Sequence, residues 1–303
     1  MILAALLASA WLAAAQPAEA PSIPATSVLV APKPAQVLPG APLEFRSVDG
    51  WVLHAVWQQA QEGKPTLVLL SGTGQHKEVW RPFARALAKA GIGYAALDMR
   101  GHGESRTTPT GEVITYKKLR AVAKGANDYA DMVRDVEALV ANLTTASGVP
   151  EETIALAGAE VGGSVAVKYA AVHNKVPFVI MFSPGLAWQE IPLVNAVRVF
   201  KGRATSLLMV HSEADKRSSK ETPLLYAFAK NAVGERNATL IVVPEERGTR
   251  MLTRNKGLIA RVLAWISDPH TVETPAVSTA TVVESLDPAE PEIDPAPTED
   301  DAQ

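Results

Sequence analysis

The segment that most constrains the fold is a glycine-rich turn at residues 158–163, which reads GAEVGG. It follows a short apolar run and opens a segment with helical spacing, and Glu160 stands at its centre with a glycine two residues to either side. A turn of this shape holds its central residue in a strained backbone conformation and needs small neighbours to avoid clashes. It indicates a fold in which a buried strand runs directly into a helix.

Predicted strands and helices alternate through residues 41–269. A continuous apolar run such as 66–70 indicates a strand covered on both faces, and apolar spacing of three and four indicates helices, the longest with Asn127 as a candidate N-cap. The predicted strands are 43–46, 51–57, 66–70, 93–97, 153–157, 178–182, 206–210 and 239–243. The predicted helices are 80–90, 127–143, 162–171, 192–200, 221–232 and 256–266. We therefore predict a single α/β domain with a mostly parallel central sheet and helices on both faces.

Three segments are predicted to lie outside this domain. Residues 1–20 hold an apolar run followed by Ala18-Glu19-Ala20, which is typical of a signal peptide cleaved after Ala20, although no Lys or Arg precedes the run. Residues 21–40 are rich in Pro and Ala and indicate a linker, and the acidic residues 270–303 are predicted to be a disordered tail. We expect an exported protein, periplasmic or secreted, with no stable membrane insertion after cleavage.

The amino-acid composition excludes several kinds of catalytic and binding chemistry. The chain has no cysteine, which excludes disulfides, thiolate metal sites and cysteine nucleophiles. Its net charge of −3 conceals a basic body, because residues 21–270 carry 29 bases against 22 acids, a net of +7. These bases are dispersed rather than gathered in one tract, so nucleic-acid binding is not predicted. No cofactor is indicated.

The turn and five further segments, in order along the chain, resemble motifs of the α/β-hydrolase family, particularly its small bacterial esterase- and lipase-like members. The turn at 158–163 resembles the family's nucleophile elbow, G-x-S-x-G. The other matches are LSGTG at 70–74, DMRGHGES at 98–105, FSPGL at 182–186, VHSEAD at 210–215 and ERGTRML at 246–252. The resemblance implies oxyanion-hole-like amides at Thr73 and Val161. It also implies that the catalytic triad positions are those of Glu160, Asp215 and Arg247.

Two of these three positions depart from the family. Glu160 stands where the serine nucleophile is expected, and Arg247 stands where the histidine base is expected. A serine hydrolase needs a hydroxyl that attacks and an imidazole that takes and returns the proton. Because arginine stays protonated, it cannot serve as that base. Ordinary ester hydrolysis is therefore not predicted, and no residue is assigned as catalytic.

The paired replacement suggests an ion pair. In the family fold the serine and histidine side chains meet, so Glu160 and Arg247 are predicted to meet as carboxylate and guanidinium, within about 4 Å. Asp215 is expected to hold the other side of Arg247. The arginine is expected to lower the pKa of Glu160, which weakens a role for this carboxyl group in proton transfer.

Other side chains offer weaker routes to chemistry. Ser164 lies two residues past Gly162, and is expected to pack or to bond a backbone carbonyl rather than replace the serine. Ser71 is expected to stabilise its turn, and His211 to donate to neighbouring backbone. His76, His102 and Glu160 form a metal-binding alternative, but their spacing is not of the i, i+3 or i, i+4 kind, so no metal site is predicted.

The loops at the carboxyl ends of the strands are predicted to form the rim of a cleft. Such folds bind ligands at this edge, and the basic residues there would suit a small anionic ligand. The segment 187–202 is too short for a large lid, which favours a small ligand over a long lipid. The predicted rim residues are Gly72, Gly74, His76, Arg100, His102, Lys216, Arg217 and Arg250.

Two functions of different classes remain open. The first is a non-catalytic binding or scaffold protein built on a hydrolase fold with a degenerate triad. The second is a divergent hydrolase of a small ester-like substrate, with Glu160 as nucleophile or as acid and base. The sequence names neither a ligand, a protein partner nor an oligomeric state.

Overall fold

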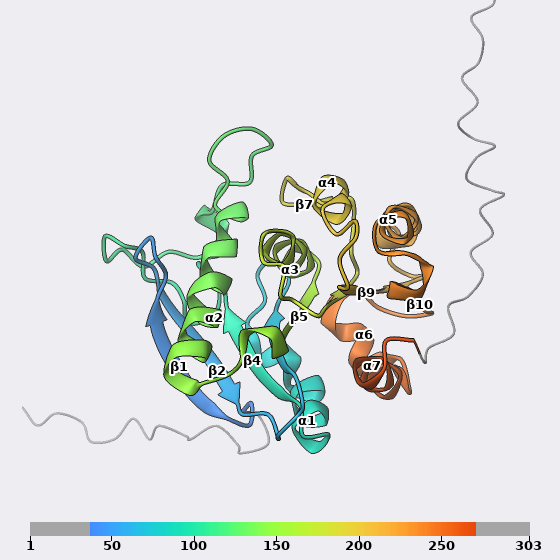
Figure 1. Cartoon of the computed structure of the whole chain (residues 1–303). Coiled ribbons are helices and arrows are strands. Elements are labelled where there is room, and N and C mark those ends of the chain that lie inside the picture. The colour runs from blue at the N-terminus through green and yellow to red at the C-terminus, as the bar shows by residue number, and fades with distance from the viewer. Residues whose placement is uncertain (1–36, 271–303) are drawn as a thin grey trace, which may run out of the picture. The chain divides into compact units, whose positions relative to one another are not determined.

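The computed structural model describes residues 37–270, which build one eight-stranded sheet (Figure 1). The strand order is β1-β2-β4-β3-β5-β6-β9-β10. β2 pairs antiparallel with β1 and with β4, and the remaining pairs are parallel. The strands are β1 (Ala41–Arg46), β2 (Val52–Gln58), β3 (Thr66–Leu70), β4 (Gly93–Asp98), β5 (Ile154–Ala159), β6 (Phe178–Phe182), β9 (Ser206–Ser212) and β10 (Ala238–Val243). The predicted α/β class is confirmed.

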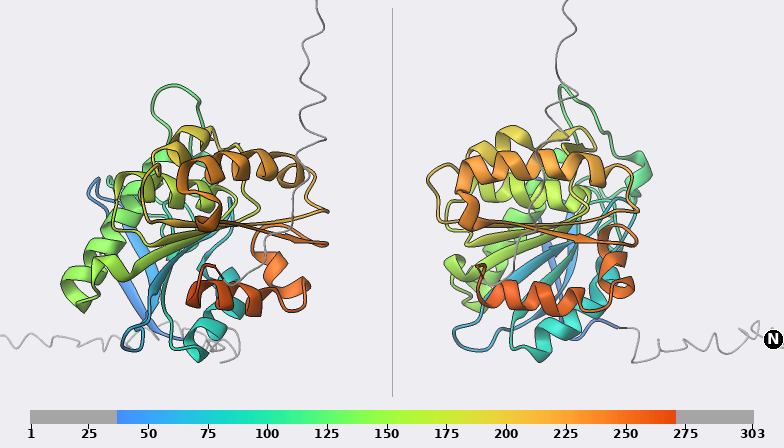
Figure 2. Two further views of the ribbon diagram at one scale, coloured as in Figure 1. Left: turned by 45° about the vertical axis from the view of Figure 1, so that its right-hand side comes forward. Right: turned by 90° about the vertical axis from the view of Figure 1, so that its right-hand side faces the viewer.

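Helices cover both faces of the sheet, which Figure 2 shows as a layer between two helical layers. One face carries α2 (Val133–Ser147), α3 (Val161–Val172), α4 (Val194–Arg198) and α5 (Ser218–Val233). The other carries α1 (Arg81–Lys89), α6 (Met251–Arg254) and α7 (Leu258–Ser267).

The alternation of side chains along each strand divides the core in two. In β3, Val68 and Leu70 pack in the cluster under α2 to α5, whereas Leu67 and Leu69 pack in the cluster under α1 and α7. All four are fully buried, which explains why this strand is a continuous apolar run rather than an alternating one.

Small residues let α3 lie close to the sheet. A Cβ atom on Gly158 would come within 2.3 Å of the Gly162 carbonyl group, and one on Gly162 would come within 2.3 Å of the Leu70 carbonyl oxygen. The two glycines that define the turn in the sequence are therefore required by close approach of backbone to backbone. They place the turn at the carboxyl ends of β3 and β5.

Two predicted boundaries are wrong. The helix predicted over 127–143 is α2, which starts at Val133 and follows a 3₁₀ turn, Ala130–Met132. Asn127 caps that turn instead, since its Oδ1 accepts hydrogen bonds from the N–H groups of Tyr129 and Ala130 at 3.0 and 3.2 Å. The packed fold also begins before residue 41, because Leu38 is buried and Tyr94 donates a hydrogen bond to the Pro39 carbonyl.

A two-stranded hairpin, β7 (Ala187–Trp188) and β8 (Ile191–Pro192), lies between β6 and α4 and was not predicted. Its turn residues Gln189 and Glu190 both have positive φ, 49° and 60°, as a two-residue hairpin turn requires. Gln189 Nε2 donates to Thr73 Oγ1 at 3.1 Å. This short hairpin therefore reaches the loop after β3, although the segment holds no lid domain.

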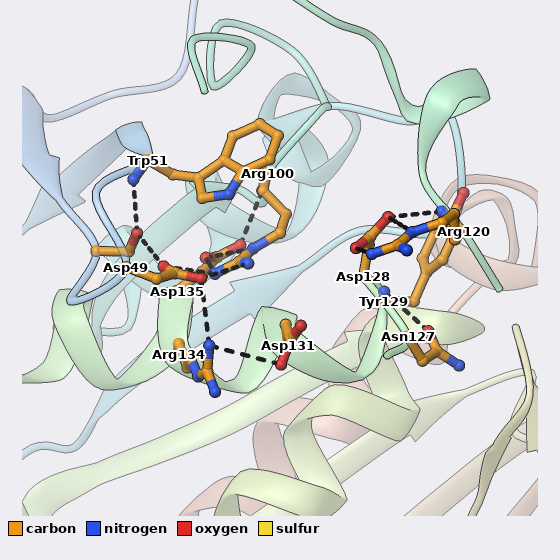
Figure 3. A network of polar contacts seen from close by, with 11 residues as sticks. Asp49, Trp51, Arg100, Arg120, Asn127, Asp128, Tyr129, Asp131, Arg134 and Asp135 are labelled. Atoms are coloured by element: carbon orange, nitrogen blue, oxygen red, sulfur yellow. Dashed lines mark hydrogen bonds and ion pairs between the residues drawn. The ribbon is translucent and has the colours of Figure 1, made fainter. Parts of the chain in front are cut away.

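The long connection from β4 to α2 is anchored by a buried arginine (Figure 3). Arg100 donates three hydrogen bonds to Asp135 of α2, from its backbone N–H, Nε and Nη2, at 2.6 to 2.9 Å. It donates two more to Asp49 in the β1–β2 turn, at 2.8 and 3.1 Å, and its guanidinium lies 5.5 Å from the Trp51 ring centroid. Arg100 thus joins three elements that are far apart in the sequence.

The predicted signal peptide, most of the predicted linker and nearly all of the acidic tail lie outside the described residues. Within residues 37–270, no helix has both the length and the hydropathy needed to cross a bilayer.

Candidate functional site

Glu160 occupies the strained turn that the sequence predicts. Its φ of 51° and ψ of −116° lie outside the regions that most residues with a side chain adopt. Hydrogen bonds hold this conformation on both sides: the Glu160 N–H donates to the Phe182 carbonyl at 2.9 Å, and its carbonyl accepts from the Ser164 N–H at 3.2 Å. The elbow geometry of the family is present, with a carboxylate at its tip.

The Glu160 carboxylate is enclosed by two glycines. A Cβ atom on Gly72 would lie 2.7 Å from Glu160 Oε2, and one on Gly248 would lie 3.5 Å from Oε1. The side chain is only 7% exposed. The carboxylate therefore lies against Gly72, the residue before Thr73, on one side and against Gly248 on the other.

Arg247 pairs with this carboxylate. Its Nε lies 3.3 Å from Glu160 Oε1, so the predicted ion pair is confirmed. The two partners are in different environments, because the Arg247 side chain is 64% exposed whereas Glu160 is buried. The pair therefore consists of a buried anion and a cation that reaches it from the solvent.

Two serines that the sequence analysis did not single out position the Arg247 loop. Ser183, at the end of β6, accepts a hydrogen bond from the Gly248 N–H at 2.8 Å. Ser212, at the end of β9, donates to the Glu246 carbonyl. Both serines are fully buried. Both lie in segments that resemble family motifs, 182–186 and 210–215, but their contacts with the Arg247 loop depend on where β10 ends.

Asp215 does not hold Arg247, so that prediction is wrong. Its Oδ1 instead accepts from the N–H groups of Arg217 and Ser218, at 3.3 and 3.2 Å, at the start of α5. Its Oδ2 is buried and has no hydrogen-bond partner among the described residues. Arg247 pairs with Glu160 instead, and most of its side chain is in the solvent.

Burial raises the pKa of Glu160 above its ordinary value, and this effect is larger than the predicted lowering by Arg247, which is also present. Arg247 does act in the lowering direction, and so does Arg250, but Asp215 adds to the raising effect of burial. An exposed guanidinium is partly screened by water, so it offsets only part of the cost of burying a carboxylate.

This shift predicts how Glu160→Gln changes stability with pH. Between the ordinary value of 4.5 and the raised pKa, the folded chain holds a proton that the unfolded chain has lost, so the free energy of unfolding falls as pH rises through that window. Glu160→Gln should therefore raise Tm at pH 7, by roughly 2–4 °C if the gain is about 1 kcal/mol. Below pH 4.5 the two proteins should unfold at the same temperature.

Thermal unfolding followed by circular dichroism at pH 4 and pH 7 checks this prediction. Glu245→Gln is the matched control, because its side chain is exposed at the neighbouring cavity wall and should leave Tm unchanged at both pH values. A lower Tm for Glu160→Gln at pH 7 would mean that the ion pair with Arg247 outweighs the cost of burial.

Arg100 and His102 were predicted to lie on the cleft rim, but they do not, and the same feature of the fold explains both. Both side chains are only 3% exposed, because the β4–α2 connection folds back over them. Arg100 is bound by Asp49 and Asp135, and His102 stacks on Tyr116 with its Nδ1 2.9 Å from the Arg100 carbonyl. They stabilise the connection and leave the cleft less basic than predicted.

The remaining rim residues differ in how far their side chains are exposed and in what they contact. Lys216 and Arg250 are exposed, as are His76 and Gly74. Arg217 is exposed but engaged, because its Nε lies 3.0 Å from Glu221 and its guanidinium stacks 4.3 Å above the Trp188 ring. An open cavity of about 470 Å³ adjoins Asp215, Arg247 and Arg250.

The weaker candidates can also be placed. Ser164 is fully buried in α3, Ser71 Oγ donates to the His76 carbonyl at 3.2 Å, and His211 Nδ1 lies 3.3 Å from the Ser212 carbonyl. Among residues 37–270, no group of three histidines and carboxylates is arranged to hold a metal ion, so His76, His102 and Glu160 do not come together as ligands.

The sheet order, the elbow and the loops around it define an α/β hydrolase. Residues 61–287 match the family described as serine aminopeptidase, S33. This match covers most of the chain, so the protein belongs to this family of α/β hydrolases. None of the curated proteins compared with the chain matches it significantly.

Solved structures of esterases share the fold. The esterase Pf2001 from Pyrococcus furiosus superposes with a TM-score of 0.59 and 19% identity over 75% of this chain and 91% of its own. The α/β hydrolase GrgF from Penicillium sp. sh18 gives a TM-score of 0.59 and 16% identity over 77% of this chain and 99% of its own. Est1E from Butyrivibrio proteoclasticus, solved with ferulic acid, gives a TM-score of 0.54 and 17% identity over 74% of this chain and 96% of its own. At these identities the likeness concerns the fold.

Proposed function

We propose that this protein is a non-catalytic binding protein built on the α/β-hydrolase fold, with Glu160, Asp215 and Arg247 as a degenerate triad. One observation carries the proposal: the carboxylate of Glu160 and the guanidinium of Arg247, which stand where the motifs of the family have the nucleophile and the base, lie 3.3 Å apart. Neither group can do what serine and histidine do, because the arginine cannot accept a proton and the glutamate has no base beside it.

The position of the carboxylate adds a steric argument. Glu160 fills the space against Gly72, where the carbonyl oxygen of an ester would need to approach the amides of Thr73 and Val161. A negative charge there also repels the oxyanion that ester hydrolysis develops. The arrangement therefore opposes acyl transfer both by volume and by charge.

The ligand that fits the remaining site is a small anion. The cavity of about 470 Å³ beside the triad positions has Arg247 and Arg250 in its wall, next to Asp215, Glu245 and Glu246, and the two exposed guanidinium groups are its donors to an anion. A volume of this size accommodates a metabolite rather than a long acyl chain. An exported protein, as residues 1–20 lead us to propose, would bind such a ligand outside the cytoplasm.

A divergent hydrolase is the second candidate, and the raised pKa of Glu160 favours it. A buried carboxyl group whose pKa lies closer to neutrality is better suited to transfer a proton than an ordinary glutamate. In this alternative Glu160 acts as acid and base on a small ester-like substrate, and Arg247 stabilises its charged form.

Hydrolysis of a panel of short-chain nitrophenyl esters separates the two candidates. The protein and its Glu160→Ala variant are assayed side by side, with Ser164→Ala as a control for the buried serine. We expect no rate above buffer in any of the three. Turnover by the unaltered protein that disappears in Glu160→Ala would overturn the binding proposal and make Glu160 a catalytic residue.

A further inference from the structure

The cavity beside Glu160 presents two guanidinium groups from one turn. Arg247 immediately precedes the 3₁₀ turn Gly248–Arg250, and Arg250 ends it. Both residues line the cavity of about 470 Å³, together with three carboxylates, those of Asp215, Glu245 and Glu246. Two arginines three residues apart on one turn can place their N–H donors on the same oxyanion, in the way that arginines bind carboxylate and phosphate.

Each of these arginines is held by a single weak contact to a carboxylate. Arg247 lies 3.3 Å from Glu160, and Arg250 lies 3.9 Å from Glu246. Their side chains are 64% and 73% exposed. Both guanidinium groups are therefore open to an anion from the solvent. The Arg250–Glu246 pair is exposed and contributes little to stability, so an anion can displace Glu246 at small cost.

Displacement at Arg247 has a larger consequence for Glu160. Its side chain is 7% exposed, and Arg247 is the nearest positive charge to it. If Arg247 turns to a ligand, the buried carboxylate keeps only the weaker influence of Arg250 and the repulsion of Asp215. A buried carboxylate without a counterion takes up a proton rather than remain charged.

We infer that Glu160 and Arg247 form an anion-operated gate: a small oxyanion binds across Arg247 and Arg250, releases Arg247 from Glu160, and Glu160 takes up one proton. The inference rests on the proposed binding function and adds its regulation. Carboxylates and tetrahedral oxyanions such as phosphate share the chemistry that two guanidinium groups recognise. Acid promotes binding, because protonation of Glu160 frees Arg247 in advance.

The groups that face Glu160 restrict the titration to this carboxyl group. The charged groups that act on it are Arg247, Arg250 and Asp215. The loop over 71–75 and the loop over 183–186, which also border the turn, contain no charged residue.

Calorimetric titration of the protein with sodium sulfate and with sodium formate, between pH 5 and pH 8, tests the gate. Neither probe changes its charge greatly in this range, and the two separate tetrahedral from planar oxyanions. Above the pKa of Glu160, each unit rise in pH should weaken binding by up to about 10-fold, which is the limit for one proton per anion. Titrations in buffers of different ionisation enthalpy should show that proton being taken up.

Variants assign the effect to the gate. Glu160→Gln should bind with the same affinity at every pH, equal to that of the unaltered protein at low pH. Arg250→Gln should bind more weakly but keep the proton uptake, and Arg247→Gln should lose it. Arg254→Gln is the matched control, because Arg254 is 69% exposed and lies 4.0 Å from Glu246 but outside the cavity, so it should change nothing.

Two results would overturn the inference in different ways. Affinity that is independent of pH, and equal in the unaltered protein and Glu160→Gln, would remove the gate and leave anion binding in place. No binding by any protein, Glu160→Gln included, would remove both the gate and the anion as ligand. The ester assay decides independently whether the protein is an enzyme.

Discussion

Replacing Glu160 by serine and Arg247 by histidine together should turn the protein into an ester hydrolase. We expect the double variant to hydrolyse short nitrophenyl esters about 10²–10⁴-fold faster than Glu160→Ser alone, the usual contribution of a positioned general base. The reason is that the two substitutions restore the groups that attack and that transfer the proton, whereas the single variant restores only the hydroxyl.

Three features of the structure support this gain. The elbow already holds residue 160 at φ 51°, the conformation that exposes a nucleophile. Serine is shorter than glutamate and would vacate the space against Gly72 and Gly248. Asp215 retains a buried Oδ2 without a hydrogen-bond partner among the described residues, which can accept the N–H of a histidine at position 247.

Initial rates on the ester panel check the prediction, and Asp215→Asn in the double variant should lose most of the gain. A double variant no faster than Glu160→Ser would show that the surroundings of the triad, and not only its side chains, have departed from hydrolase geometry. That result would also strengthen the case for binding as the protein's long-standing role.

Arg100→Met should be the most destabilising of the single substitutions considered for this protein. It leaves Asp135, which is fully buried, without its guanidinium partner, and it removes both hydrogen bonds to Asp49. Breaking a buried ion pair from one side costs about 3–5 kcal/mol. For a domain of this size the corresponding fall in Tm is roughly 6–20 °C.

Thermal and urea unfolding at pH 7 measure this loss. Arg134→Met is the matched control: Arg134 contacts Asp49 at 3.5 Å and Asp131 at 3.8 Å, but it is 49% exposed, so its removal should cost about 1 kcal/mol or less. If changing Asp135 to Asn in the Arg100→Met variant restores most of the lost stability, the destabilisation comes from the unpaired charge of Asp135. A fall no larger than that of Arg134→Met would contradict a structural role for the network in Figure 3.

The fold class and the position of the candidate site could both be predicted from the sequence. The strand at Thr66–Leu70 is buried on both faces, which favours a continuous apolar run, and that run predicted the strand from the sequence. A Cβ atom on Gly158 or Gly162 would come within 2.3 Å of neighbouring backbone, so both glycines are required, and their spacing predicted the turn at Glu160. The meeting of Glu160 and Arg247 followed from these, because the fold brings their two positions together.

The burial of these charged groups and its effect on their electrostatics depend on the folded structure, and the sequence pattern did not predict them. Arg100 and Arg250 are both arginines on loops, yet one is buried between two aspartates and the other is in solvent, and no local pattern distinguishes them. Arg247 lowers the pKa of Glu160, as expected, but it is exposed, and the larger effect of burying the carboxylate leaves that pKa raised. Burial depends on which distant segments cover a side chain, so the electrostatics of this site depended on the folded structure.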